Sequence, residues 1–334
     1  MRSKEFIMTE VRLDTTAIDR SSRRKLRVPF DAAFVPSIII ILLVILSVAS
    51  PVFLSSRNLA QILLQISTLG IAAVGATFVI ISGDLDLSIG ANVAVSGVIT
   101  AIATMNWFGG NWVLGVALGI GCGVFIGLVN GFLSAILRVP AFIATLGVGV
   151  IAGGLALWLT NGLTVSGLPE DFAALATTNF LGLQTLVWFM LATFLIGGIV
   201  LHFTNHGLRT FAVGGNREAA FLSGVPVSRV RITNFAIAGL CAGLAGVLLT
   251  ARVQAGQPSI STTLTLYATA AVILGGTSLL GGEGSMLRTF FGVLLIGVVQ
   301  NGLDILRVDY ALKEVAVGTV FVLAAASEAL RRRR

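Results

Sequence analysis

Charged residues are scarce in this chain. Asp, Glu, Lys and Arg make up only 11% of its 334 residues, less than half of the roughly 25% found in soluble domains. Hydrophobic residues account for 56%, and the mean hydropathy is +0.97. Repeated apolar runs approach the roughly 20 residues that cross a bilayer as a helix. The composition therefore excludes a large soluble domain and predicts an all-α, polytopic membrane protein.

Lysine is almost absent, and this excludes one class of nucleotide site. The chain has only Lys4, Lys25 and Lys313, and none lies in a Gly-x4-Gly-Lys-Ser/Thr arrangement. That arrangement builds the phosphate-binding loop of many ATPases. We therefore expect no ATP hydrolysis and no cofactor on this chain.

Ionisable residues are also missing from the centres of the apolar runs. Carriers driven by ions or protons usually need buried ionisable groups inside the membrane. A pore-forming subunit driven by a separate ATPase fits this absence better than a stand-alone secondary carrier. The carrier, or a channel acting alone, remains the alternative.

Cysteine and histidine are too few for a metal site or a disulfide framework. Cys122 and Cys241 both fall inside apolar runs, where they are expected to be small core residues. His202 and His206 lie near an expected membrane boundary, without other candidate ligands beside them. We predict structural roles for all four and no metal site.

The apolar runs predict about ten membrane spans. A basic tail over residues 1–33 is followed by a transmembrane domain over 34–330 and a basic C-terminus over 331–334. The expected spans cover residues 34–54, 58–82, 87–106, 112–136, 141–161, 183–204, 231–252, 264–281, 286–303 and 313–330.

The distribution of positive charge predicts the orientation of these spans. With the N-terminus inside, 18 of the 22 Lys and Arg residues fall on the cytoplasmic side. This is the bias that the positive-inside rule describes. Both termini and the polar segment 205–231 are therefore expected to be cytoplasmic, and the net charge of +7 concerns topology rather than nucleic acid.

The longest internal polar segment, 205–231, contains the signals of a short helix. Asn216 is a suitable N-cap, Glu218 lies in the first turn, and Gly224 with Pro226 ends the helix. A polar helix between two membrane spans must lie outside the hydrocarbon. It either docks onto a soluble partner or is only a solvated loop that carries topology charges.

A second unusual stretch, residues 82–90 (SGDLDLSIG), joins two apolar runs. In one interpretation it is a turn, in which Gly83 allows a tight bend and Asp86 caps the next helix. In the other it is a break in a span that lines a path for substrate. The two interpretations are compatible.

Two pairs of similar segments indicate an inverted repeat. Residues 129–132 (VNGF) resemble 300–303 (QNGL), and 86–89 (DLSI) resemble 257–260 (QPSI). The first pair leaves the membrane in opposite directions in the expected topology, as an inverted duplication requires. Chance similarity between apolar sequences is the alternative.

Glycines in the spans, including the series Gly115, Gly119, Gly121, Gly123 and Gly127, are expected to let helices approach closely.

Five stretches together resemble the ribose-type permeases of ABC importers. They are 214–224 (GGNREAAFLSG), 83–90 (GDLDLSIG), 129–131 (VNG), 140–147 (PAFIATLG) and 271–284 (AVILGGTSLLGGEG), and the resemblance covers roughly residues 58–325. It implies the ABC importer permease fold in a bacterial inner membrane. The implied partners are a cytoplasmic ATP-binding subunit, a periplasmic substrate-binding protein and a second permease subunit, identical or related.

The resemblance also assigns roles to residues. The first stretch resembles the motif that couples such permeases to their ATPase, and the others supply candidates for the translocation path. The coupling candidates are Asn216, Arg217, Glu218, Ala219, Ala220, Ser223 and Gly224, and the path candidates are Asp84, Asp86, Ser88, Asn130, Thr145, Tyr267 and Thr277. At 265 and 267, where many relatives carry acidic residues, this chain has Thr265 and Tyr267.

The identity of the solute is not fixed by these motifs. The wider group carries sugars and related polyols, nucleosides or branched amino acids. Because the path candidates offer hydroxyls, amides and an aromatic ring, we favour a neutral sugar or polyol. Nucleosides and branched-chain amino acids remain alternatives.

Overall fold

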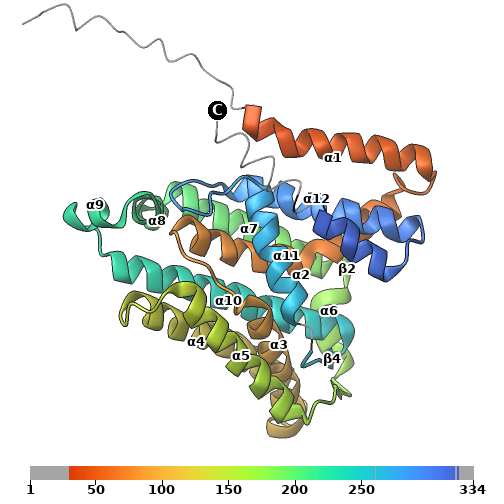
Figure 1. The fold of residues 1–334 in the computed structure, drawn as a ribbon. Coiled ribbons are helices and arrows are strands. Elements are labelled where there is room, and N and C mark those ends of the chain that lie inside the picture. The colour runs from red at the N-terminus through yellow and green to blue at the C-terminus, as the bar shows by residue number, and fades with distance from the viewer. Residues whose placement is uncertain (1–29, 260, 320–321, 323–334) are drawn as a thin grey trace, which may run out of the picture.

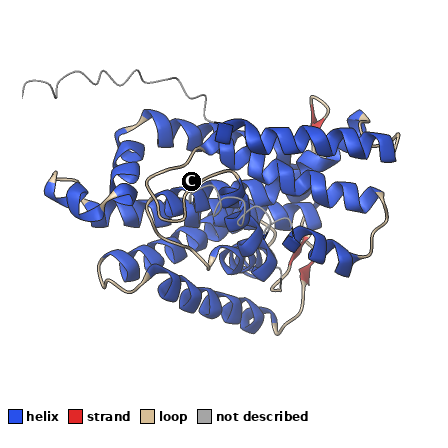
Figure 2. Ribbon diagram, turned by 45° about the horizontal axis from the view of Figure 1, so that its top comes forward, coloured by secondary structure: helices blue, strands red, loops and turns tan. Residues whose placement is uncertain are grey.

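The computed structural model describes residues 30–259, 261–319 and 322. Residues 1–29 of the basic tail predicted over 1–33 and the basic C-terminus over 331–334 therefore lie outside the described residues, as does most of the last expected span. Two-residue strands make the only sheets in the described part: β1 (Val165–Ser166) pairs with β4 (Ala255–Gly256), and β2 (Asn179–Phe180) with β3 (Leu183–Gln184). The remaining elements are helical, so the all-α prediction is confirmed (Figure 2).

The helices follow the apolar runs closely. Seven of them are long and apolar enough to cross a membrane: α2, α3 with its π turn, α4, α5, α7, α10 and α12. The full set is α1 (Phe30–Ala49), α2 (Ser56–Ile81), α3 (Ile89–Ile102), the π turn η2 (Ala103–Trp107), α4 (Trp112–Ala135), α5 (Ala141–Thr160), α6 (Glu170–Thr177), α7 (Thr185–Phe203), α8 (Asn205–Gly215), α9 (Arg217–Leu222), α10 (Val227–Val253), α11 (Ser261–Leu274) and α12 (Met286–Ile305).

The remaining three expected spans are only partly matched. The apolar parts of α1 and α11 are shorter than a full span, and α11 ends at Leu274 rather than near residue 281. A further helical stretch runs from residue 310 to 319, where the tenth span was expected. Ten membrane crossings therefore remain a prediction, while a polytopic helical protein is confirmed.

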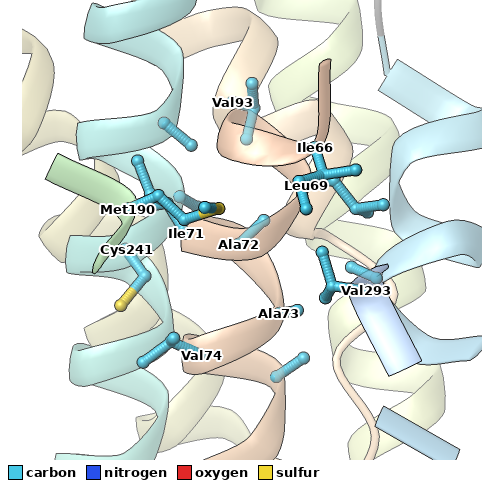
Figure 3. Close-up of a cluster of buried hydrophobic side chains, with 14 of the residues drawn as sticks. Ile66, Leu69, Ile71, Ala72, Ala73, Val74, Val93, Met190, Cys241 and Val293 are labelled. Atoms are coloured by element: carbon cyan, nitrogen blue, oxygen red, sulfur yellow. The ribbon is translucent and has the colours of Figure 1, made fainter. Parts of the chain in front are cut away.

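Helix α2 forms the centre of the core. Its residues from Ser67 to Ile81 are all buried, and it packs against α7, α10, α11 and α12. Figure 3 shows Ile71 and Val74 on the side of this helix that faces Met190 of α7 and Cys241 of α10, and Ala73 on the side that faces Val293 of α12. An all-round apolar helix of this kind is expected in the interior of a bundle.

Glycines bring α4 and α10 into backbone contact, as the sequence predicts for part of the series. A Cβ atom on Gly123 would lie 2.5 Å from the carbonyl oxygen of Gly239, and one on Gly127 would lie 2.2 Å from that of Phe235. By contrast, Gly121 has nothing within 4 Å. Close helix approach therefore depends on one face of α4 only.

The packing has the pattern that an inverted repeat predicts. If α10, α11 and α12 are the second copy of α2, α3 and α4, each contact between helices should recur with the two copies exchanged. The contact of α4 with α10 recurs as that of α12 with α2, and the contact of α3 with α4 recurs as that of α11 with α12. Ser228 at the start of α10 bonds to the end of α4, and Asn58 at the start of α2 bonds to Asn301 near the end of α12. These junctions lie at opposite ends of α2, because Arg231 of α10 reaches Asp84, just after α2. The geometry supports the repeat.

The connecting segments gather at two opposite ends of the helices. In Figure 1, α8 and α9 lie at the left end, whereas α6, β2 and β4 lie towards the right end. The turn after α2 and the 275–285 loop meet α8 at its end, since Gly282 donates to the carbonyl oxygen of Ile81 (2.9 Å) and adjoins Gly215. This end therefore holds the polar segments from which the site is built.

Candidate functional site

Helix α9 forms as its capping residues predict. The Asn216 side chain accepts a hydrogen bond from the backbone N–H of Ala219 at 2.9 Å. The helix ends at Leu222, and Ser223 is its C-cap. Gly224 then adopts a φ of +80°, which favours glycine and turns the chain towards α10. The preceding helix, α8, was not predicted, because the helix signals recognised in the 205–231 segment began only at Asn216.

The side chains of α9 divide between the protein and the surface. Ala220 is buried with Val213 of α8 and Val230 of α10, so it anchors the helix to its own chain. Phe221 and Leu222 are 69% and 78% exposed. Glu218 and Ala219 are exposed beside them. Phe221 and Leu222 were not among the candidate residues, although two large apolar residues in a polar segment were a signal.

Arg217, the first residue of α9, ties this helix to the end of α2. Its Nη2 lies 2.7 Å from Oδ1 of Asp84 and also donates to the carbonyl oxygens of Gly83 (2.8 Å) and Ser82 (3.3 Å). Asp84 and Arg217 come from different candidate groups, path and coupling, and the structure brings them together.

Asp84 has a second basic partner, Arg231 in the first turns of α10. Nε of Arg231 donates to Oδ2 of Asp84 at 2.7 Å, and Nη2 donates to Oδ1 at 2.9 Å, in a two-point arrangement. Nη1 of Arg231 also donates to the carbonyl oxygen of Ser134. The Asp84 side chain is therefore fully engaged by two cations from the 205–231 segment.

Close backbone contact reinforces this junction. A Cβ atom on Gly214, near the end of α8, would lie 1.8 Å from the carbonyl oxygen of Ile81, and one on Gly281 would lie 2.8 Å from Cα of Gly83. Thr277 is also nearby, because its Cγ2 and the Ile81 side chain both approach Gly284. Its hydroxyl is buried and has no hydrogen-bond partner in the part of the chain that the structure describes. Displacing α8 and α9 would thus displace the end of α2.

Asp86, Ser88 and Asn130 form a buried hydrogen-bond chain inside the next turn. Oδ1 of Asp86 accepts from the N–H (2.8 Å) and the hydroxyl (2.6 Å) of Ser88, and the Ser88 hydroxyl in turn accepts from Nδ2 of Asn130 at 2.7 Å. The capping prediction for Asp86 is wrong. Ser88 is the N-cap of α3, and Asp86 closes a local turn two residues earlier.

The electrostatics of Asp86 differ from those of Asp84. Burial raises the pKa of the Asp86 carboxyl above its ordinary value of 3.8, although the hydrogen bonds from Ser88 oppose this shift. No Lys or Arg side chain pairs with Asp86 in the described part of the chain. It is therefore a buried acid held only by neutral donors.

Thr145 fixes the backbone of the same stretch from the first turns of α5. Its hydroxyl accepts from the N–H of Leu87 at 3.0 Å and lies 3.2 Å from the carbonyl oxygen of Leu85, to which it donates. Five of the seven path candidates, those from Asp84 to Thr145, thus gather around residues 84–88. Gly83, with a φ of +76°, provides the predicted bend.

The Tyr267 hydroxyl donates to Oε2 of Glu314 at 2.8 Å and so joins α11 to the helical stretch after α12. Thr265, on the same helix, accepts a hydrogen bond from the N–H of Gly90 at 2.8 Å, at the start of α3. Among the described residues, no group of three or more His, Cys, Asp or Glu side chains is arranged to hold a metal.

Comparison with known proteins identifies relatives across most of the chain. Residues 58–325 match the family model described as "Branched-chain amino acid transport system / permease component". The ribose import permease protein RbsC of Bacillus subtilis is 39% identical over 286 residues, covering 85% of this chain and 88% of the relative. The L-arabinose ABC transporter permease protein AraH of Azospirillum brasilense is 37% identical over 295 residues, covering 88% and 86%.

The ribose import permease protein RbsC of Escherichia coli (strain K12) is similar to the same extent. It is 38% identical over 290 residues, which cover 86% of this chain and 90% of the relative. No solved structure matches the chain.

Proposed function

The chain belongs to this permease-component family, and on that premise we propose that it forms the membrane pathway of a sugar importer of the ATP-binding-cassette class. It is a multi-pass protein of the inner membrane and a transport subunit rather than an enzyme. The family implies an ATPase subunit and a substrate-binding protein as partners. The relatives named for ribose and L-arabinose favour a pentose as the solute.

The observation that carries the docking role is the exposed apolar end of α9. Phe221 and Leu222 leave most of their surface uncovered on a helix that lies outside the apolar runs. Exposed apolar side chains with a polar rim are typical of protein interaction sites. The ATPase of the importer is the soluble partner that such a helix would bind, with Glu218 and Ala219 beside the apolar pair.

The anchoring of α9 to its own chain supports a role in transmitting movement from the ATPase to the membrane helices. Ala220 packs against other helices of this chain, and Arg217 forms an ion pair with Asp84 in the turn after α2. Movement of α9 with the ATPase would therefore carry the end of α2 and the turn that holds Asp86. A rigid-body shift of this kind is an established route for coupling between sites.

The proposed orientation places α8, α9 and both termini in the cytoplasm. At the α9 end lie Arg138, Arg209, Arg217, Arg229, Arg231 and Arg288, whereas Arg57, Arg252, Arg307 and Lys313 belong to the opposite end. This agrees with the positive-inside rule. Cysteine placed at Asn216, in a background without Cys122 and Cys241, should be labelled from the inside only. Labelling from outside intact cells would reverse the orientation.

We also infer a second permease subunit in the assembly, either a copy of this chain or a related chain. Large apolar side chains remain exposed along α4 and α5, including Phe125, Phe132, Val150 and Ile151. A second subunit and the lipid bilayer would share these faces. Cysteines placed singly along α5 should cross-link to the second subunit where this face meets it, and should not cross-link where the face meets lipid.

Co-purification with the ATPase from detergent tests the docking role. We expect Ala219→Arg and Leu222→Glu to insert normally and to lose the ATPase, because a charge in a packed interface is costly to desolvate. Ala311→Arg is the matched control, since Ala311 is also exposed but lies at the opposite end. Retention of the ATPase by both α9 variants would show that α9 is not the docking element.

A further inference from the structure

A basic cavity lies beside α9, between the end of α4, the start of α5 and the start of α10. Its volume is about 420 Å³. Three arginines, Arg138, Arg217 and Arg231, line it together with the single carboxylate of Asp84. Because Asp84 is already bonded to Arg217 and Arg231, the lining keeps an excess of positive charge.

Two polar groups in this lining have no partner among the described residues. Arg138 makes no hydrogen bond or ion pair among the described residues, although it is held at a φ of +57° in the short link between α4 and α5. The Ser134 side chain is 1% exposed, and its hydroxyl is buried without a hydrogen-bond partner. An unsatisfied buried hydroxyl is costly unless a ligand or water completes it.

Two long helices also begin at the cavity without side-chain caps. Ala141 is the first residue of α5, and Val227 is the first residue of α10. Both line the cavity, and neither helix start has a side-chain capping bond. The N–H of Val227 already donates to the carbonyl oxygen of Val225 at 2.8 Å, whereas the N–H of Ala141 makes no backbone hydrogen bond among the described residues. Free N–H groups and the positive end of the helix dipole attract anions. Guanidinium groups, a free hydroxyl and two helix starts thus converge on one space.

We propose that this cavity binds the phosphate group of an anionic phospholipid from the adjoining leaflet. Phosphate accepts several charge-assisted hydrogen bonds and suits arginine geometry. Basic pockets between helices at the cytoplasmic surface recognise phospholipid head groups in this way. The cavity shares Asp84 and Arg217 with the proposed link between α9 and the α2–α3 turn, and Phe221 with the proposed ATPase-docking surface.

The surroundings favour a lipid over free phosphate as the source of this group. Leu137, beside Arg138, and Phe142, beside Ala141, are 56% and 51% exposed. Acyl chains of a lipid whose head group occupies the cavity would cover these apolar side chains. Inorganic phosphate would leave them uncovered.

Binding of phosphatidylglycerol to the purified permease tests the proposal, with phosphatidylcholine and inorganic phosphate as the comparison arms. Retained lipid is measured by native mass spectrometry over a titration. Loss of one arginine contact should weaken phosphatidylglycerol binding about fivefold, so Arg138→Gln should show this change. Because Arg138 is exposed and unbonded, the variant should fold normally. Ser134→Ala should weaken binding in the same direction.

Arg229→Gln is the matched control. Arg229 is an exposed arginine on the first turn of α10 that does not line the cavity. It should bind lipid as the parent does. Equal loss in Arg138→Gln and Arg229→Gln would overturn the proposal, as would equal binding of phosphatidylcholine. Displacement of the lipid by inorganic phosphate would assign the site to a free ion instead. Release of lipid when the ATPase binds would assign the cavity to the ATPase.

Discussion

Arg217 and Asp84 are 133 residues apart in the chain, yet Nη2 of the first lies 2.7 Å from Oδ1 of the second. This contact joins the first residue of α9 to the turn that follows α2. The carboxylate is buried, whereas the Arg217 side chain is 43% exposed. Solvent screening therefore limits the stability that Arg217 adds. The position of Arg217 indicates that it links the movement of α9 to that of the turn after α2, more than that it stabilises the fold.

Asp84→Asn should destabilise the fold much more than removal of Arg217. The substitution leaves the largely buried Arg231 guanidinium without its counter-ion. Breaking a buried pair on one side costs about 3–5 kcal/mol. We expect a clear fall in the thermal unfolding temperature in detergent. Asp171→Asn, which changes an exposed acid on α6, is the control. A similar unfolding temperature for both variants would contradict the importance of this pair.

Asp86→Asn should keep the fold and impair transport. The amide oxygen of Asn can accept both bonds from Ser88, and the neutral group avoids the burial cost that raises the Asp86 pKa. With a raised pKa, this carboxyl stabilises the fold most below its ordinary value of 3.8, and that contribution is lost as pH rises through the raised value. The variant should therefore be at least as stable at neutral pH.

The transport effect of Asp86→Asn is measured with radiolabelled ribose and L-arabinose in parallel. If the charge serves the path, uptake should fall about tenfold, the effect of losing one charged hydrogen bond. Uptake equal to that of the parent, at equal membrane abundance, would reject a role for this charge in the path and leave Asp86 as a turn residue.

Gly123→Ala should destabilise the protein, whereas Gly121→Ala should not. The added methyl group on Gly123 would meet backbone atoms of Gly239 and Gly243 on α10, which cannot rotate away. Overpacking of this kind costs about 1–3 kcal/mol. At Gly121 there is open space, so alanine should be neutral or gain up to about 1 kcal/mol in helix propensity. Equal unfolding temperatures would contradict the close contact of α4 and α10.

Local signals in the sequence predicted the parts of the site that depend on neighbouring residues. The N-cap of α9 at Asn216 and the bend at Gly83 need only a few adjacent residues, and both are confirmed. The burial of α2 was not predicted, because α4 is just as apolar and yet remains largely exposed. Helix α8 was missed because Asn205 and His206 are polar, although its buried face contacts α7 and α10.

Long-range pairing could not be predicted in the same way. Nothing near Asp84 in the sequence indicates Arg217 or Arg231, because these contacts depend on how α8 folds back over the end of α2. The same holds for Asn130, which reaches Ser88 from α4. The prediction that Asp86 caps α3 is wrong because α3 starts two residues later than a capping aspartate at this position requires.

The central claim is that α9 passes movement of the ATPase to the α2–α3 turn through Arg217, and ATP-dependent uptake by the reconstituted Arg217→Ala complex tests it most directly. Arg229→Ala, another exposed arginine of the same segment, is the control. The account predicts that Arg217→Ala retains the ATPase and hydrolyses ATP, while uptake falls about tenfold, as expected for one lost charged contact. Uptake equal to that of the control, with the ATPase bound, would contradict it.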